Sequence, residues 1–223
     1  MKITWLGQAG LLFESGLRVM IDPYLSDSVG VKHGNPRRVP VDERFFAEAP
    51  DVMIFTHNHL DHYDPDTVER FFALGKKMLI LCPRSVWAEV RQLGGGHNFV
   101  CFDAGTEWTE GGIRFRAVPA VHSDFDAIGV ILTAEGKNYY VTGDTLYSRA
   151  LLAELPELEA IFLPINGVGN NMNAVDGARL AVESGAKYKV PLHVGLLDAL
   201  RAEDIFDVPG RVVPKFYEEI VLS

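Results

Sequence analysis

The segment from residue 52 to residue 64, Val-Met-Ile-Phe-Thr-His-Asn-His-Leu-Asp-His-Tyr-Asp, constrains this chain more than any other. Its apolar and β-branched beginning predicts a buried strand, which leads directly into His57, His59, Asp61 and His62. Side chains two positions apart in extended or turning backbone point the same way, so His57 and His59 can bind one cation together. Asp61 and His62 then face a neighbouring position. Imidazole nitrogens and carboxylate oxygens suit zinc, manganese and iron.

A polar turn rich in histidine is the structural alternative for the same segment. A single histidine would favour that interpretation. Three imidazoles and a carboxylate within six residues are costly to bring together without a cation. The pattern therefore favours a metal site.

The segment resembles the signature of the metallo-β-lactamase superfamily of binuclear metal hydrolases. That superfamily also has a later His, then a Gly-Asp and then a last His, each at the end of a strand. This chain has His122 in Val-Pro-Ala-Val-His, Asp144 in Val-Thr-Gly-Asp-Thr and His193 in Val-Pro-Leu-His-Val-Gly. The resemblance spans nearly the whole chain. It implies an α/β fold, the four-layer αβ/βα sandwich, with residues 1–223 as one domain.

The resemblance also implies how the ligands are shared between two metal ions. One ion takes His57, His59 and His122, the other takes Asp61, His62 and His193, and Asp144 bridges them. Two divalent cations roughly 3.5–4 Å apart can share a water molecule and hold substrate oxygens between them. Zinc lowers the pKa of bound water to about 7 in favourable sites, so a metal-bound hydroxide is expected at neutral pH. Asp61 is the expected catalytic residue, because it can orient that hydroxide or pass a proton to the leaving group.

Composition narrows the class of protein. A chain of 223 residues with 48% hydrophobic and 23% charged residues is typical of one globular α/β domain. The formal charge of −9 argues against a nucleic-acid partner, which requires a basic surface. The N-terminus shows no leader, and no apolar stretch approaches the roughly 20 residues of a membrane span. Cys82 and Cys101 lie in apolar runs, which predicts buried, reduced thiols in a cytoplasmic protein; a disulfide is the less favoured alternative.

The order of predicted elements indicates where the ligands lie. Strands alternate with helices up to residue 102, hairpins follow, and alternation then resumes, which predicts sheets covered by helices. Strands are expected at 2–6, 11–15, 17–21, 52–56, 77–81, 99–102, 107–109, 113–118, 128–134, 138–142, 160–165 and 188–192, and helices at 65–74, 84–93, 148–152 and 174–184.

Asp64 is expected to cap the helix that begins at Pro65 rather than to bind metal. A turn before a capped helix is the alternative for Asp144, but the other ligands outweigh it.

Residues 23–41 contain Gly, Pro, Ser and Asn without a clear period, which predicts a long loop. The loop carries Lys32, His33, Arg37 and Arg38 in an otherwise acidic chain. A solvated loop is one interpretation. A flap that presents positive charge to an anionic substrate is the other, with His33, Arg37 and Arg38 as candidate substrate-binding residues.

Two further features allow both a structural and a functional interpretation. Asp22 precedes Pro23 and can simply start a turn. Relatives in the superfamily place an aspartate here that orients a metal-bound imidazole, and both interpretations stay open. The loop from Asn166 to Asn173 can be ordinary turn and capping chemistry. Because it follows a strand, we expect Asn166 or Asn171 to reach the pocket.

The ligand types favour hydrolysis. Oxygen-reducing di-iron members of the superfamily carry Glu where this chain has His59, and they need a flavin domain for which this chain lacks the length. The segments Thr-Gly-Asp-Thr, Asn-Met-Asn-Ala-Val-Asp and Pro-Leu-His resemble the L-ascorbate-6-phosphate lactonase-like branch, which opens a sugar-acid lactone, often with manganese. The resemblance thus implies a lactonase or esterase that uses two zinc or manganese ions, with iron as a third option. The expected substrate is a small molecule that can be anionic or phosphorylated.

Two other functions remain open at this stage. A phosphodiesterase of the same fold would require the cationic loop to face the metal ions. A metal-binding sensor or scaffold without catalysis belongs to a different class, and the complete ligand set argues against it. No membrane partner is expected, and the sequence leaves a homo-oligomer open.

Overall fold

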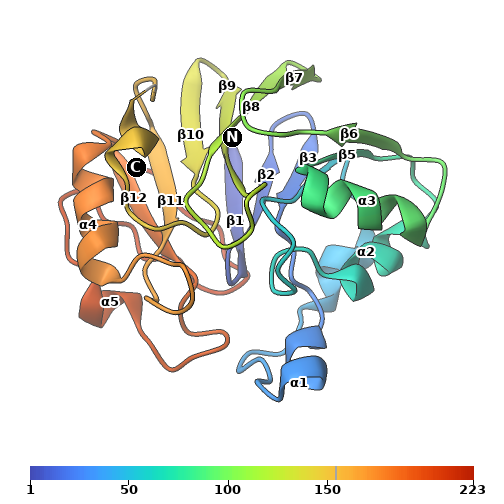
Figure 1. Cartoon of the computed structure of the whole chain (residues 1–223), viewed down its shortest axis with the longest axis horizontal. Coiled ribbons are helices and arrows are strands. Elements are labelled where there is room, and N and C mark those ends of the chain that lie inside the picture. The colour runs from blue at the N-terminus through green and yellow to red at the C-terminus, as the bar shows by residue number, and fades with distance from the viewer. Residues whose placement is uncertain (154) are drawn as a thin grey trace.

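The computed structural model describes residues 1–153 and 155–223. Two six-stranded sheets pack face to face in the middle of the molecule, and helices cover the outer face of each (Figure 1). The layers run helix, sheet, sheet, helix. This is the four-layer sandwich that the resemblance implies.

The first sheet contains the first six strands in chain order. These are β1 (Lys2–Gly7), β2 (Gly10–Glu14), β3 (Arg18–Ile21), β4 (Val52–Ile54), β5 (Leu79–Cys82) and β6 (Asn98–Cys101). Strands β1 to β3 are antiparallel, and β3 to β6 are parallel. Helices α2 (Pro65–Phe72) and α3 (Arg84–Leu93) cover its outer face (Figure 1). Their apolar sides, such as Val68, Phe71 and Val86, are buried against Met53 and Ile80.

The second sheet has the order β12, β11, β10, β9, β8, β7. Its strands are β7 (Glu107–Glu110), β8 (Ile113–Pro119), β9 (Ile128–Ala134), β10 (Lys137–Val141), β11 (Ala160–Pro164) and β12 (Tyr188–Leu192). Hairpins join β7 to β10, whereas β10, β11 and β12 are parallel. Helices α4 (Ala174–Glu183) and α5 (Ala202–Ile205) lie on its outer side (Figure 1). The short helix expected at 148–152 is the 3-10 helix η2 (Arg149–Leu152).

The main core lies between the two sheets. Alternate residues of each strand point into it, as in β8, where Ile113, Phe115 and Ala117 are buried. Phe13 of the first sheet meets Phe162 of the second edge to face, with ring centroids 5.8 Å apart. This core holds the carboxyl ends of strands from both sheets in place, and those ends carry the candidate ligands.

Several expectations about local structure need correction. Residues 23–41 contain a helix, α1 (Ser28–His33), which projects from the rest of the molecule (Figure 1), and the 3-10 helix η1 (Glu43–Ala47) follows. A helix of six residues is too short to show a hydrophobic period. Asp64 occupies the N-cap position of α2, but its carboxylate accepts a hydrogen bond from the Thr67 hydroxyl instead of a helix N–H. Cys101 is only half-buried, and both cysteines are free.

Among residues 1–153 and 155–223, no helix is both long enough and apolar enough to cross a membrane.

Candidate metal centre

Three imidazoles form a nearly equilateral triangle at the boundary between the sheets. The ring centroids of His57 and His59 are 4.6 Å apart, those of His57 and His122 also 4.6 Å, and those of His59 and His122 4.7 Å. The first two residues follow β4 and the third follows β8, so each sheet contributes. Together with Asp144, these side chains bring ligand atoms within 4.8 Å of one another, close enough to hold a metal ion.

A second group of ligand atoms lies directly beside the triangle. Asp61, His62 and His193 bring one ligand atom each within 4.8 Å of one another. His193 Nε2 lies 3.2 Å from both His62 Nε2 and Asp61 Oδ2. Residues 131 positions apart in the chain therefore share one site. The division into two groups is the one that the resemblance implies.

Asp144 lies between the two groups. Its Oδ2 atom is 3.2 Å from His62 Nε2, 3.3 Å from His193 Nε2 and 4.0 Å from His57 Nε2. Asn171 Nδ2 donates a hydrogen bond to the same oxygen over 2.9 Å. The other oxygen, Oδ1, is buried without a hydrogen-bond partner among the described residues.

Hydrogen bonds to the outer ring nitrogens decide which imidazole nitrogen faces the cluster. His62 Nδ1 donates to Asp22 Oδ2 over 2.8 Å, and His122 Nδ1 donates to the carbonyl of Asn170 over 3.3 Å. The Thr56 hydroxyl donates to Asp22 and therefore accepts from His57 Nδ1, at 3.0 Å. In the neutral form of each of these rings, Nε2 therefore carries the lone pair towards the cluster, which is the tautomer that a metal ligand needs.

The donor set fits a metal ion. His57 Nε2 and Asp144 Oδ1 are buried polar atoms that have no hydrogen-bond partner in the part of the chain that the structure describes. Leaving such atoms unpaired costs about 1–3 kcal/mol each. A divalent cation would satisfy both, so the observed cluster is capable of binding metal.

The contacts of Asp22 favour the functional one of its two interpretations, in which it orients a ligand imidazole. Its carboxylate accepts from the Thr56 N–H at 2.8 Å and from His62 Nδ1 at 2.8 Å, and it is fully buried. It therefore fixes the ring of His62 and the loop that carries His57.

The two groups differ in how easily their histidines gain a proton. Burial lowers the pKa of His57 and of His122. Burial also acts on His193, but the carboxylates of Asp144 and Asp61 outweigh it and raise the pKa to about 10. The pKa of His62 is raised in the same way, because Asp144, Asp61 and Asp22 outweigh its burial. Without metal, His62 and His193 therefore hold protons that His57 and His122 do not.

Comparisons with known proteins agree with this geometry. A family model described as "Beta-lactamase superfamily domain" matches residues 17–194. A UPF0173 metal-dependent hydrolase of Bacillus pumilus is 32% identical over 209 residues, which covers 86% of this chain and 85% of the relative. A second such protein, from Saccharolobus solfataricus, is 30% identical over 231 residues, covering 100% of this chain and 96% of the relative. This chain belongs to the UPF0173 metal-dependent hydrolase family.

Solved structures show the same architecture. A possible metal-dependent hydrolase from Veillonella parvula superimposes with a TM-score of 0.79 at 20% identity, covering 99% of this chain and 98% of the other. The metallo hydrolase Igni18 of Ignicoccus hospitalis gives a TM-score of 0.75 at 20% identity, with 98% and 97% covered. The UPF0173 chain thus has the metallo-β-lactamase fold.

Gln8 is a site residue of this UPF0173 protein that the sequence analysis missed. Its Nε2 donates to Asp61 Oδ2 over 2.9 Å and lies 3.2 Å from His193 Nδ1. Asn166 Nδ2 approaches the same ring nitrogen at 3.0 Å, as expected for a residue of that loop. A lone glutamine has no recognisable motif. The one available signal is a polar residue between glycines, Gly7 and Gly10, directly after a buried strand.

Three residues of the centre have left-handed backbones although none is glycine. The φ angles are +51° for Gln8, +46° for Asp22 and +63° for His193. Such a conformation costs roughly 1–2 kcal/mol per residue. The His193 N–H donates to the Gln8 carbonyl over 3.0 Å, so two of these residues hold each other. Strained residues that gather in this way are typical of functional sites.

Replacing Gln8 by methionine, which has a similar size, is expected to lower metal affinity or turnover by about 10–100-fold, the usual effect of removing a partner of a ligand. Titration with a competing chelator measures the affinity. Gln92→Met on the exposed side of α3 is the matched control and should change nothing. Unchanged affinity and turnover in the Gln8 variant would show that the contact does not position Asp61.

Two small cavities open onto the centre. One, of about 340 Å³, is lined by Gln8, His33, Asn35, Asp61 and Asn166, among others. The other, of about 250 Å³, is lined by residues that include His122, Asp144 and Asn171. No Lys or Arg is among the described residues that line either cavity.

The cationic residues of 23–41 therefore do not form one flap over the centre. His33 lines the cavity beside Asp61, as expected. The guanidinium of Arg37 is turned into its own loop, and Arg38 lines a separate cavity. Lys32 is exposed. The expectation that Arg37 and Arg38 meet substrate at the metals is thus wrong, because α1 and the turn after it send neighbouring side chains in different directions.

Arg37 stabilises the loop. It donates hydrogen bonds to the carbonyls of Val39, Ser26 and Tyr24 and to the hydroxyl of Tyr217, at 2.7, 2.8, 3.3 and 2.7 Å. Arg37→Met is expected to reduce the free energy of unfolding by about 2–3 kcal/mol, because hydrogen bonds from a charged group are lost. Denaturant titration measures this. Arg38→Met, whose guanidinium lacks such bonds to the described residues, should stay within about 0.5 kcal/mol of wild type.

Proposed function

We propose that this UPF0173 hydrolase is a binuclear metal-dependent esterase or lactonase. The observation that carries the proposal is the position of Asp144 Oδ2, which lies within 4.0 Å of histidine nitrogens from both ligand groups. One carboxylate shared by two groups of ligands suits a pair of divalent cations. His57, His59 and His122 would hold one cation, and Asp61, His62 and His193 the other. Zinc and manganese both accept this mixture of imidazole and carboxylate.

When bound, two such cations supply a hydroxide nucleophile at neutral pH and polarise the carbonyl of an ester. The chain's own residues orient the reacting groups and transfer protons. Burial raises the pKa of Asp61, but His62 and His193 outweigh it and hold that pKa low, so Asp61 is a carboxylate at neutral pH. It lines the cavity, where it can accept a proton from the attacking water. The water oxygen forms a bond to the carbonyl carbon, the ester C–O bond breaks, and the same proton passes to the departing alcohol oxygen.

The lining of the two cavities favours an uncharged ester or lactone with hydroxyl groups. Amides and an imidazole (Asn35, Asn166, Gln8 and His33) can hydrogen-bond hydroxyls. No described Lys or Arg is there to compensate a phosphate. The volumes suit a small molecule. This supports a lactone more strongly than a phosphodiester, and any negative charge on the substrate would have to lie at the metal ions.

A substrate screen tests the proposal. The protein loaded with zinc or with manganese is assayed with a panel of sugar-acid lactones and simple esters and with bis-p-nitrophenyl phosphate. We expect turnover of lactones to exceed turnover of the phosphodiester by at least about tenfold, and Asp61→Asn to lose it. Asp66→Asn, on the exposed side of α2, is the control.

The opposite outcomes identify the alternatives. Faster hydrolysis of the phosphodiester would make the protein a phosphodiesterase. Stoichiometric metal without turnover of any compound would favour a metal-binding sensor or scaffold. Activity that survives complete removal of metal would refute the mechanism.

A further inference from the structure

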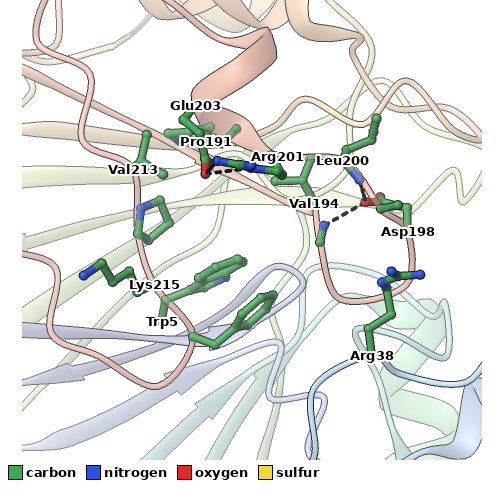
Figure 2. A pocket seen from close by; sticks show the side chains of 15 residues that line it. Trp5, Arg38, Pro191, Val194, Asp198, Leu200, Arg201, Glu203, Val213 and Lys215 are labelled. Carbon is green, nitrogen blue, oxygen red and sulfur yellow. Dashed lines mark hydrogen bonds and ion pairs between the residues drawn. The ribbon is translucent and has the colours of Figure 1, made fainter.

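A cavity of about 660 Å³, whose lining Figure 2 shows, lies next to the cavity at the metal centre. The loop after His193 lies between this cavity and the one at the metals: Val194, Gly195 and Leu200 line the first, Leu197 lines the second, and Asp198 lines both. None of the candidate metal ligands lines it. Its size is within the range of small-molecule sites.

One side of the cavity is aromatic. Trp5 and Phe216 stack with ring centroids 4.3 Å apart and planes at 18°. Trp5 is only 3% exposed, and its Nε1 donates to the Gln8 carbonyl over 3.0 Å, so the ring pair is held rigidly. Pro191 and Val213 add apolar surface opposite the rings. Such a surface suits a flat, apolar ring.

The free charge in the cavity is positive, although the chain carries a net charge of −9. Asp198 is occupied, because its Oδ1 accepts from the N–H groups of Gly195 and Leu200, both at 2.8 Å. Arg201 is paired with Glu203 at 2.7 Å. The carboxylates of Asp198 and Glu203 therefore already have partners within the chain.

Arg38 is the cation without a partner. Its guanidinium forms no hydrogen bond or ion pair with any residue in the described parts of the chain, and it lines the cavity. Lys215 lies across the cavity from it in Figure 2 and makes only an exposed contact of 3.9 Å with Glu218. The backbone of Arg38 is held in place, since its N–H donates to the Leu196 carbonyl over 2.8 Å. An unpaired guanidinium on a backbone held in this way can pair with a carboxylate.

We propose that this cavity binds a small aromatic carboxylate. The ring packs against Trp5 and Phe216, and the carboxylate pairs with Arg38. The ligand is a second molecule and not the substrate of the metal centre, because the loop 194–200 stands between the two sites.

Binding is tested with three probes that share a phenyl ring and differ in charge. These are phenylacetate (negative), 2-phenylethanol (neutral) and 2-phenylethylamine (positive). The metal-loaded Trp87→Phe/Trp108→Phe variant leaves Trp5 as the single tryptophan of three, so its fluorescence reports on this cavity. Ligand-observed NMR on the wild-type protein gives an independent measurement. We expect phenylacetate to bind at least about tenfold more tightly than the alcohol, equivalent to about 1.4 kcal/mol, and the amine to bind most weakly.

Variants test whether the carboxylate pairs with Arg38 and whether the ring lies in this cavity. Arg38→Gln should remove the preference for phenylacetate over the alcohol, whereas Arg201→Gln, whose cation is already paired, should keep it. Ala199→Phe, which places a ring in the cavity from an exposed position, should weaken binding of both probes at unchanged metal content.

Equal affinities for the three probes, or no binding by either method at 10 mM, would overturn the proposal. The proposal would also be overturned if the affinity for phenylacetate were unchanged in Arg38→Gln and Ala199→Phe but lost on chelation. The carboxylate would then bind at the metal ions.

Discussion

Replacing Asp144 with asparagine is expected to reduce turnover by about a thousandfold, equivalent to roughly 4 kcal/mol, and to release at least one metal ion. Asparagine has nearly the same shape and keeps an oxygen that can accept the hydrogen bond from Asn171 Nδ2. The main change is therefore the loss of the negative charge. That charge lies 3.2 Å from His62 Nε2 and 3.3 Å from His193 Nε2. No other described carboxylate contacts both ligand groups in this way.

Elemental analysis of the purified variant and a steady-state assay measure the two effects separately. Asp66→Asn serves as the control for expression and handling, because Asp66 is exposed in the first turn of α2. An Asp144→Asn protein that keeps two metal ions per chain would show that the carboxylate is not shared between them. Loss of metal with undiminished hydrolysis would refute the metal-dependent mechanism itself.

The second large effect concerns the pH dependence of metal loading. In the metal-free protein His193 has its pKa raised to about 10, so it holds a proton at pH 7 that a metal ion must displace. The pKa of His62 is raised too, so affinity of this group should rise by at least about tenfold per pH unit, or at least about a hundredfold between pH 6.5 and 8.5. The pKa values of His57 and His122 are lowered, so these two ligands are already deprotonated and the affinity of the triangle should change less over this range.

Competition with a chelator of known affinity, repeated across this pH range, resolves the two loading steps. Calorimetry in two buffers of different ionisation enthalpy counts the protons released. In His193→Ala the steep step should disappear while the shallow one remains. Equal slopes for both steps in the wild-type protein would show that the two groups do not differ in bound protons.

The sequence indicated which side chains the fold brings together, because their positions follow a local rule. His57, Asp144 and His193 each come directly after an apolar, β-branched run, and parallel strands bring their carboxyl ends together. The resemblance added the division into two groups. Asp22 had two interpretations, since a residue before proline starts turns whether or not its side chain meets an imidazole.

Other residues could not be placed in this way. Gln8 is one polar residue in a tight turn, and its importance arises from contact with Asp61, which lies 53 positions away. His33, Arg37 and Arg38 look equivalent as a local concentration of charge. They reach three different environments, because a short helix and a turn lie between them and the sheet.

Strand pattern and ligand chemistry, both local properties, therefore indicate a metal site at strand ends, and the family resemblance of these motifs adds the fold and the metal-dependent hydrolase. Only the tertiary structure decides which imidazole nitrogen faces the cluster, where the unpaired guanidinium of Arg38 lies and which side chains line each cavity. The physical reason is that tautomers, unpaired charges and cavities depend on contacts between segments far apart in the chain, and no periodicity within a single segment records them.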